Sequence, residues 1–259
     1  MASYEFCTVE RDGHLTIVTI NRPDMMNSLH PPANFELEKV FNDFASDPKQ
    51  WVAILTGAGD RAFSAGNDLK WTASGKKLDI PPTGFAGLTA RYNLNKPVIA
   101  AVNGVAMGGG FEIALACDII IASDKAKFAL PEPKVGLAAG AGGLLRLPRQ
   151  IGLKQAMGMI LTARHVSAAE GYRMGFVNEV VPHEETLSAA KRWAAEIAEC
   201  SPMSIRTSKE MATQGLDYAG MEAAGNAKYA AFANLFSHPD AVEGPRAFAE
   251  KRKPKWADS

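Results

Sequence analysis

The sequence predicts an α/β fold that is followed by a helical C-terminal region. Apolar runs typical of buried strands alternate with helical apolar spacing up to about residue 143, and nearly every later segment has helical spacing. The chain has 259 residues, of which 47% are hydrophobic, so it can bury one large core without disulfides or metals. The composition changes near residue 200, which predicts a core over 1–200 and a helical region over 201–259.

The strand predictions rest on continuous apolar runs that end at turn residues. LTIVTI at 15–20, VAILT at 52–56 and VIAAV at 98–102 predict three buried strands. Shorter runs at 119–122, 128–130 and 177–181 predict further strands.

The helix predictions rest on apolar spacing of three and four residues. Residues 33–44 show it before Asp47-Pro48, while the polar stretch 74–84 predicts a surface loop. After Gly143, the predicted helices cover 153–162, 167–174, 183–199, 202–214, 218–236 and 238–252, the last interrupted near Pro245.

Charge and cysteine content exclude several classes of protein. Lys plus Arg and Asp plus Glu both number 28, which argues against a broadly basic nucleic-acid-binding surface. Cys7, Cys117 and Cys200 are far apart, and the five histidines show no HExxH, so neither a disulfide framework nor a metal site is expected. The first residues show no secretory signal, and no apolar run is long enough to cross a bilayer, so we expect a cytoplasmic protein.

The glycines are concentrated in three clusters that follow predicted strands. The first, TGAGDRA at 56–62, matches the weak form of a dinucleotide fingerprint, but the following residues 63–68 are predicted to form a loop and not a helix. A dinucleotide cofactor is therefore disfavoured. The second cluster, Gly108 to Gly110, precedes a buried apolar helix whose free N–H groups suit a developing negative charge.

Two acidic residues follow strand–turn junctions of this region. Glu112 lies inside the predicted helix, where it could simply satisfy the N–H groups of its own first turn. Glu132 lies between Pro131 and Pro133, where it could be an exposed turn residue paired with Lys134. The alternative is that the two carboxyl groups form an acid/base pair with different environments.

Together, these segments resemble the crotonase superfamily of enoyl-CoA hydratases and isomerases. The resemblance rests on five motifs and extends over nearly the whole chain, and the ending DAVEGPRAFAEKRKPKW (240–256) is similar to the carnitinyl-CoA dehydratase branch. The five motifs are NRPDMMNSL (21–29), AFSAGNDLK (62–70), KPVIAAVNGVAMGGGFEIALACDIIIA (96–122), FALPEPKVG (128–136) and GAGGLLRLPRQIG (140–152).

The resemblance implies a spiral of ββα units and a C-terminal helical region that builds homotrimers, usually paired as hexamers. It implies an oxyanion hole formed by the backbone N–H groups of Asn67 and Gly109, and Glu112 and Glu132 as the catalytic acid and base. It also implies a water-orienting N–H at Gly140, although the family often has Pro where this chain has Ala139.

The implied reaction is reversible addition of water to a 2-enoyl-CoA thioester, or dehydration of a 3-hydroxyacyl-CoA such as carnitinyl-CoA. CoA would be part of the substrate, and no cofactor, metal, nucleic acid or membrane partner is implied. Alternatives are another reaction of the family (isomerisation, thioester hydrolysis or decarboxylation) and a non-catalytic binding role. Trp71 could form an aromatic wall for a trimethylammonium group, or it could simply pack. The CoA-binding residues implied by the resemblance are Asn27, Leu29, Ala65, Asp68, Leu69, Phe248 and Lys251.

Overall fold

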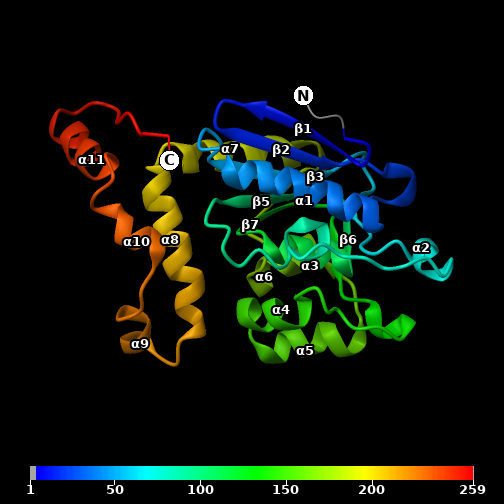
Figure 1. The fold of residues 1–259 in the computed structure, drawn as a ribbon. Helices are drawn as coiled ribbons and strands as arrows, with labels where there is room; N and C mark the ends of the chain where they lie inside the picture. The colour runs from blue at the N-terminus through cyan, green and yellow to red at the C-terminus, as the bar shows by residue number, and fades with distance from the viewer. Residues whose placement is uncertain (1–3, 259) are drawn as a thin grey trace.

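Two sheets contain the ten strands that the computed structural model assigns within residues 4–258, the part of the chain that it describes (Figure 1). The six-stranded sheet has the order β1-β2-β3-β5-β7-β10, and the four-stranded sheet has the order β4-β6-β8-β9. The strands are β1 (Cys7–Asp12), β2 (Leu15–Ile20), β3 (Val52–Gly57), β4 (Ala62–Ser64), β5 (Val98–Val102), β6 (Val105–Met107), β7 (Ile119–Ser123), β8 (Lys127–Ala129), β9 (Val166–Ser167) and β10 (Glu179–Val181).

The helices pack around these sheets and continue into a C-terminal arm. They are α1 (Pro31–Ser46), α2 (Leu69–Ala73), α3 (Gly109–Ala116), α4 (Gly143–Ile151), α5 (Leu153–Thr162), α6 (Ala168–Met174), α7 (Thr186–Ala198), α8 (Pro202–Gln214), α9 (Met221–Gly225), α10 (Ala230–Leu235) and α11 (Asp240–Ala249). None of the described helices is both long and apolar enough to cross a bilayer.

From β3 to β8, consecutive strands alternate between the two sheets, which makes this part of the topology a repeated unit. Strands β3, β5 and β7 pair in parallel in the larger sheet, and each is followed at once by a strand of the smaller sheet, β4, β6 and β8. Only β1 with β2 and β8 with β9 are antiparallel among the described pairs. This repetition brings the loops after β4, β6 and β8 to one region of the molecule.

Both faces of the six-stranded sheet are buried, as its apolar strands predict. Leu55 and Val102 face a core that includes Phe41 of α1 and Phe111 of α3, while Ile54 and its neighbours face α7. Parallel strands that are covered on both sides have unbroken apolar sequences. The bounds of β2, β3 and β5 were therefore predicted within about a residue.

Several short or atypical elements were not predicted. Strand β1 has the polar sequence CTVERD, because it is a half-exposed edge strand paired only with β2. Strands β4 and β6 have three residues each, and the expectation that Phe63 and Ser64 belong to a loop is wrong. Helix α4 was also not predicted, and it contains Pro148 within its length.

Two predictions for the C-terminal region are wrong. The single helix expected over 218–236 is divided into α9 and α10, because Gly220 lies before the first and Tyr229, before the second, is extended. The interruption expected near Pro245 is absent from the described α11, which runs through that residue. The remaining predicted helices, 153–162, 167–174, 183–199 and 202–214, are confirmed to within three residues.

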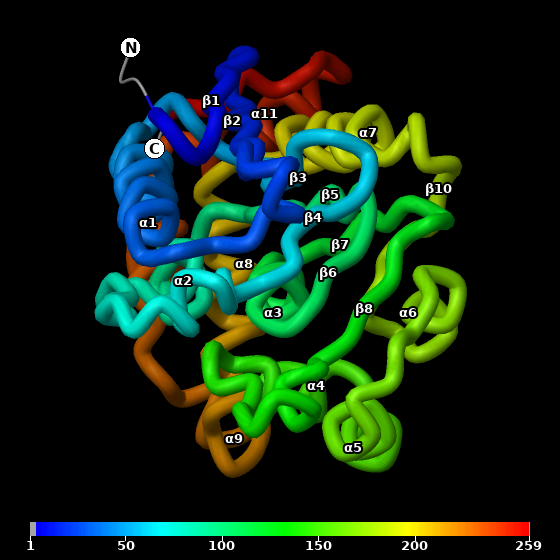
Figure 2. The backbone as a smooth tube through the Cα atoms, turned by 90° about the vertical axis from the view of Figure 1, so that its right-hand side faces the viewer, coloured from blue at the N-terminus to red at the C-terminus, as the bar shows by residue number. Residues whose placement is uncertain are grey.

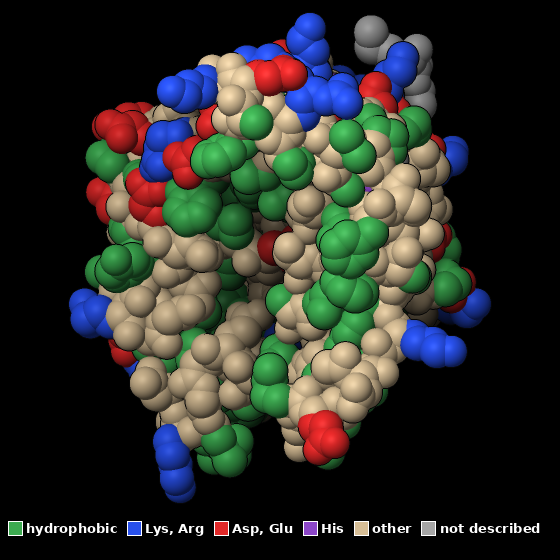
Figure 3. Space-filling view, turned by 90° about the vertical axis from the view of Figure 1, so that its left-hand side faces the viewer, with side chains coloured by type: hydrophobic (Ala, Val, Ile, Leu, Met, Phe, Trp, Pro, Cys, Tyr) green, Lys and Arg blue, Asp and Glu red, His purple; other side chains and the backbone are tan. Residues whose placement is uncertain are grey.

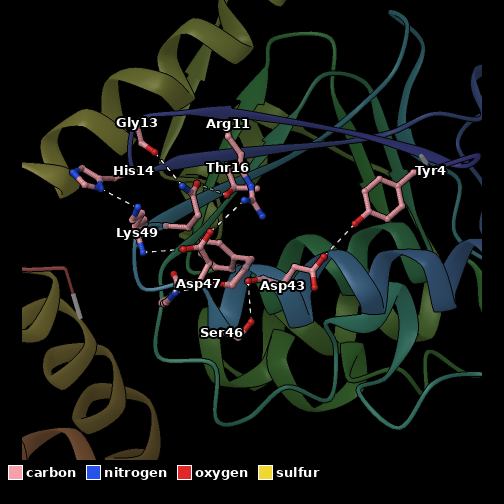
Figure 4. A network of polar contacts seen from close by, with 12 residues as sticks. Tyr4, Arg11, Gly13, His14, Thr16, Asp43, Ser46, Asp47 and Lys49 are labelled. Atoms are coloured by element: carbon pink, nitrogen blue, oxygen red, sulfur yellow. Dashed lines mark hydrogen bonds and ion pairs between the residues drawn. The ribbon is translucent and has the colours of Figure 1, made fainter. Parts of the chain in front are cut away.

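Polar contacts secure the unpredicted β1 and its hairpin against the end of α1 (Figure 4). Arg11 donates to Asp47 at 3.2 Å, and the buried Thr16 hydroxyl donates to the Gln50 side chain at 2.7 Å. The hairpin edge is thus held by side chains as well as by β2.

Helix α8 and the segments after it lie along one side of the sheets (Figure 1). The predicted boundary at residue 200 falls between α7 and α8. On the face that carries these helices, hydrophobic side chains gather at the surface (Figure 3). The large exposed apolar residues of this region include Leu216, Met221, Phe236 and Phe248.

Candidate active site

Glu112 is a buried carboxylate in a helix that is otherwise apolar on every side. Helix α3 begins at Gly109, directly after Gly108 turns the chain out of β6 with a φ of 54°. The Glu112 side chain does not cap this helix. Its Oε1 atom instead accepts a hydrogen bond of 2.8 Å from the N–H of Gly143, at the start of α4, and the residue is only 3% exposed. The interpretation that Glu112 satisfies its own first turn is therefore wrong.

Glu132 begins a short 3₁₀ helix (Glu132–Val135) directly after β8 and Pro131. Its Oε2 atom is buried and has no hydrogen-bond partner among the described residues. Within those residues it also forms no ion pair with Lys134, so the exposed-pair interpretation is wrong. A Cβ atom on Gly108 would lie 2.8 Å from Oε1 of Glu132, so the missing side chain there lets the carboxyl group approach α3.

The two carboxyl groups share one poorly solvated region. The pKa of Glu112 is raised to about 7. Burial is the main cause and the neighbouring charge of Glu132 adds to it, while the Gly143 N–H opposes both. Burial also raises the pKa of Glu132. Two carboxylates in a low-dielectric region resist ionising together, so the pair favours one proton shared between two acids.

Asn67 lies in the loop between β4 and α2, in an isolated parallel bridge with Leu29. Leu29 donates to Gly66 O at 2.8 Å, and Asp68 donates to Leu29 O at 3.0 Å. In such a bridge the N–H of the central residue, Asn67, points to the opposite side. This N–H has no acceptor among the described residues. The Asn67 side chain donates to the Thr72 hydroxyl at 3.0 Å.

The Asn67 loop and the start of α3 approach each other closely because glycines line the contact. A Cβ atom on Gly66 would lie 2.8 Å from the Gly109 nitrogen, and one on Gly110 would overlap the backbone oxygen of Ser64. The N–H of Gly109 likewise has no acceptor among residues 4–258. The structure therefore brings the two predicted donors, the N–H groups of Asn67 and Gly109, close to each other. Gly108, the neighbour of Gly109, is the residue against which the Glu132 carboxyl group packs.

The turn before α4 and the first residues of this helix contain one predicted site residue and three that were not predicted. The N–H of Gly140, expected to orient water, donates to Ala138 O at 2.8 Å, and the next residue, Ala141, has an N–H that lowers the pKa of Glu112. The donor Gly143 was missed because α4 was not predicted. Arg146 was also missed: its guanidinium donates to Thr89 O at 2.7 Å, and its charge lowers the pKa of Glu112. A lone cation among the apolar residues of LLRL was the available signal.

The residues expected to bind CoA fall into an inner group and an outer group. The side chains of Asn27 and Leu29 are fully buried, and the Asn27 amide donates to Ala58 O and Ala62 O. The Ala65 N–H donates to Met26 O, and Asp68 forms an ion pair of 3.0 Å with Arg22. The outer group is exposed and consists of Leu69, Phe248 and Lys251.

Phe248 and Lys251 are not brought to the other predicted residues within one chain. They lie at the end of α11, which both ribbon views place away from α2 and α3 (Figures 1 and 2). A contact with the same ligand would therefore require a neighbouring copy.

Trp71, in α2, lies beside the Asn67 loop. It packs edge-on against His30, with ring centroids 5.1 Å apart, and its Nε1 donates to Lys77 O. The Lys76 ammonium lies 4.5 Å from the centroid of its ring. The indole therefore has one face that accommodates a cation.

A separate open groove of about 490 Å³ lies between the residues after the 3₁₀ helix Phe85–Gly87 and those at the end of α8. None of the predicted site residues lines it. Its lining residues are Ala90, Tyr92, Asn93, Gln214, Asp217 and Tyr218.

Comparisons with known proteins identify the family to which this chain is similar. Residues 10–259 match the family model described as enoyl-CoA hydratase/isomerase. A carnitinyl-CoA dehydratase from Escherichia coli K12 is 43% identical over 253 residues, which cover 95% of this chain and 96% of that protein. The corresponding protein of Salmonella arizonae is 42% identical over 260 residues, covering 97% and 98%.

Solved structures show the same relationship. An enoyl-CoA hydratase from Mycobacterium marinum superposes with a TM-score of 0.92 at 37% identity, covering 98% of this chain and 99% of that one. A carnitinyl-CoA hydratase from Mycobacterium avium superposes with a TM-score of 0.77 at 38% identity, covering 99% and 100%. The two-sheet arrangement of this chain is thus the fold of these enzymes.

Proposed function

The chain belongs to the enoyl-CoA hydratase/isomerase family, and we propose that it is an acyl-CoA hydro-lyase that reversibly adds water to a 2-enoyl-CoA thioester. The observation that carries the proposal is the pair of poorly solvated carboxyl groups, Glu112 and Glu132, near the N–H groups of Asn67 and Gly109, which have no acceptor within residues 4–258. The reaction needs no cofactor, because CoA is part of the substrate.

The two carboxyl groups have environments that suit different roles. The Gly143 N–H and the Arg146 charge both favour ionised Glu112, which can take a proton from water as its oxygen adds to the β-carbon. The unpartnered Oε2 of Glu132 suits a protonated acid that delivers its proton to the α-carbon. Dehydration runs through the same steps in reverse.

The oxyanion hole stabilises the intermediate between these proton transfers. Addition at the β-carbon places negative charge on the thioester oxygen, as an enolate. The N–H groups of Asn67 and Gly109, free in the described part of the chain, can donate to that oxygen without rearranging. Loss of one such donor typically costs about 3–4 kcal/mol of transition-state stabilisation.

A carnitinyl-type acyl group is the substrate that the relatives favour. The Escherichia coli and Salmonella arizonae relatives, at 42–43% identity, are carnitinyl-CoA dehydratases, and the carnitinyl group ends in a trimethylammonium. In this chain Trp71 already has a cation, the Lys76 ammonium, at one face of its ring, 4.5 Å from the centroid. A trimethylammonium group would take that place by displacing Lys76.

A homotrimer, or a hexamer formed from two trimers, is the proposed assembly. Met221 and Phe248 are 88% and 87% exposed in the single chain, and hydrophobic side chains gather on the face that carries the C-terminal helices (Figure 3). Apolar surface of this kind is typical of protein interfaces. The C-terminal region over 201–259 would then both build the interface and place Phe248 and Lys251 against CoA in the site of a neighbouring copy. Light scattering after gel filtration measures the assembly directly.

The test of function is a panel of CoA esters whose products are identified by mass. We expect addition of water to short 2-enoyl-CoA esters and to crotonobetainyl-CoA. A product from a 3-enoyl ester without water addition would instead identify an isomerase, and release of free CoA would identify a hydrolase. Absence of turnover across the panel would contradict an enzymatic role.

A further inference from the structure

Asp68 uses both carboxylate oxygens within the chain. Oδ1 accepts a hydrogen bond of 3.2 Å from the Trp71 N–H and so caps α2, while Oδ2 lies 3.0 Å from Nη2 of Arg22. The two side chains are 7% and 14% exposed. Burial alone raises the pKa of Asp68, but the Trp71 N–H and Arg22 outweigh it and lower the pKa below its ordinary value. The acid is therefore held ionised in a fixed place.

Arg22 connects the motif at 21–29 to the motif at 62–70, because it binds Asp68, 46 residues further along the chain. Its backbone N–H donates to the Asn27 side chain at 3.0 Å, and its guanidinium donates both to Ser28 O and to Asp68. A planar guanidinium that donates in two directions fixes geometry as well as charge. The turn at 22–28 is thereby fastened to the peptide that follows Asn67.

The Asn67 N–H belongs to the Gly66–Asn67 peptide, and its direction depends on how the loop is held on either side of Asn67. Leu29 holds the loop on both sides of Asn67, through Gly66 O and the Asp68 N–H. The Asp68 N–H can stay on Leu29 only while Asp68 itself stays in place, and Arg22 and Trp71 are what hold its side chain.

We infer that the Arg22–Asp68 ion pair is a positioning device for the Asn67 N–H, and that it acts in the transition state and not in the capture of CoA. The inference rests on the proposed function, because it needs a thioester oxygen at that N–H. Neither side chain has to touch the substrate. Asp68 and Arg22 are thus positioning residues.

The kinetic test replaces Asp68 by Asn in the full-length protein. We expect kcat for hydration to fall about 10- to 100-fold, as for a partly misplaced oxyanion donor, while KM changes by less than about threefold. A loss confined to KM would overturn the inference, because it would place Asp68 in CoA binding.

The matched control is Asp118→Asn. Asp118 likewise accepts one backbone N–H, that of Val98 at 2.8 Å, and pairs with one cation, Lys209 at 2.7 Å; the side chains of Asp118 and Lys209 are 24% and 18% exposed. We expect it to lower thermal stability without lowering kcat. An equal loss of kcat in both variants would show a general effect of removing an ion pair and would overturn the inference.

A spectroscopic test works without turnover. The probe is butyryl-CoA labelled with ¹³C at the thioester carbonyl, whose stretching frequency falls when the oxygen accepts hydrogen bonds. We expect the shift on binding to be smaller in Asp68→Asn than in the unaltered protein and in Asp118→Asn. An unchanged shift in Asp68→Asn would overturn the inference, whereas no shift in the unaltered protein would contradict the oxyanion hole itself.

A milder variant keeps the test valid if Asp68→Asn folds poorly. Arg22→Lys retains the positive charge but cannot donate to Ser28 O and Asp68 with one planar group. We expect an intermediate carbonyl shift and an intermediate kcat. The double variant Arg22→Lys/Asp68→Asn should lose little more kcat than Asp68→Asn alone, because both substitutions break one unit. Fully additive losses would contradict a shared role.

Discussion

The carboxylate of Glu112, in α3, accepts a hydrogen bond of 2.8 Å from the backbone N–H of Gly143, the first residue of α4. One acid therefore serves two purposes: it satisfies a free donor at a helix start, and it faces the second acid, Glu132. The contact leaves an acid with a pKa of about 7 in the protein interior, where its charge can change near neutral pH.

Glu132→Gln tests the acid/base pair. The amide is nearly the same size but cannot release a proton, so we expect kcat to fall by about 10²- to 10⁴-fold. Binding of a saturated acyl-CoA, measured by calorimetry, should stay within a few-fold of normal. Turnover close to that of the unaltered protein would contradict the mechanism.

The stability of the protein should depend on pH through Glu112. Its pKa is raised by folding from an ordinary 4.5 to about 7, so the folded state binds more protons between these values. Stability should therefore fall as pH rises from about 4.5 to about 7, by at most about 3 kcal/mol from this group. Glu112→Gln should show less of this fall in urea unfolding at pH 5 and pH 8. Equal pH dependence in both proteins would contradict the raised pKa.

Arg146 should set the lower pH limit of hydration. It is the cation that stabilises ionised Glu112, so Arg146→Met should move the acid limb of the kcat/KM profile to higher pH. Arg149→Met is the control, because Arg149 lies on the same helix but is exposed and donates only to Leu145 O in the described structure. A profile that moves equally in both variants would indicate a general effect of charge.

Gly66 should be essential for turnover because there is no room for a side chain at this position. It has a φ of 84°, and a Cβ there would lie 2.5 Å from Met107 O and 2.8 Å from the Gly109 nitrogen. Gly66→Ala should separate the two donors and lower kcat by about 100-fold or more. Gly75→Ala tests the backbone strain alone, since Gly75 has a φ of 71° but nothing within 4 Å of its Cβ position. We expect it to cost about 1–2 kcal/mol of stability and no activity.

Lys251 should act on the nucleotide end of the substrate. Lys251→Ala should raise KM several-fold for a CoA ester but not for the matching pantetheine thioester, which lacks the nucleotide phosphates. Lys253→Ala, two residues further on and equally exposed, is the control. A rise in KM for both thioesters would assign Lys251 to the acyl or pantetheine end.

The sequence was most informative where one physical cause dominated. The apolar runs of β2, β3 and β5 predicted buried strands because both faces of their sheet are covered. The glycines at 108–110 predicted a helix start suited to negative charge, and the structure shows that Gly110 also lets α3 approach the backbone of Ser64.

What the sequence did not predict depends on contacts between distant segments. The Gly143 N–H could not be foreseen as a partner of Glu112, since 31 residues separate them and the helix that begins at Gly143 was not predicted. Arg22 and Asp68 are likewise joined only by the fold. Residue type indicated which single positions could take part in the chemistry. Which residues contact each other could be known only from the topology that brings their loops together.

Because the donors at 67 and 109 belong to the main chain, side-chain substitution can displace them but not delete them. Proline is the exception, since it alone lacks an N–H. A saturation library at position 67 should therefore divide in two: proline abolishes turnover, while the other residues vary acyl preference around a preserved reaction. The Asn67 side chain, bonded only to Thr72 among the described residues, can diverge without loss of the chemistry beside it, which makes this position a natural starting point for altering specificity.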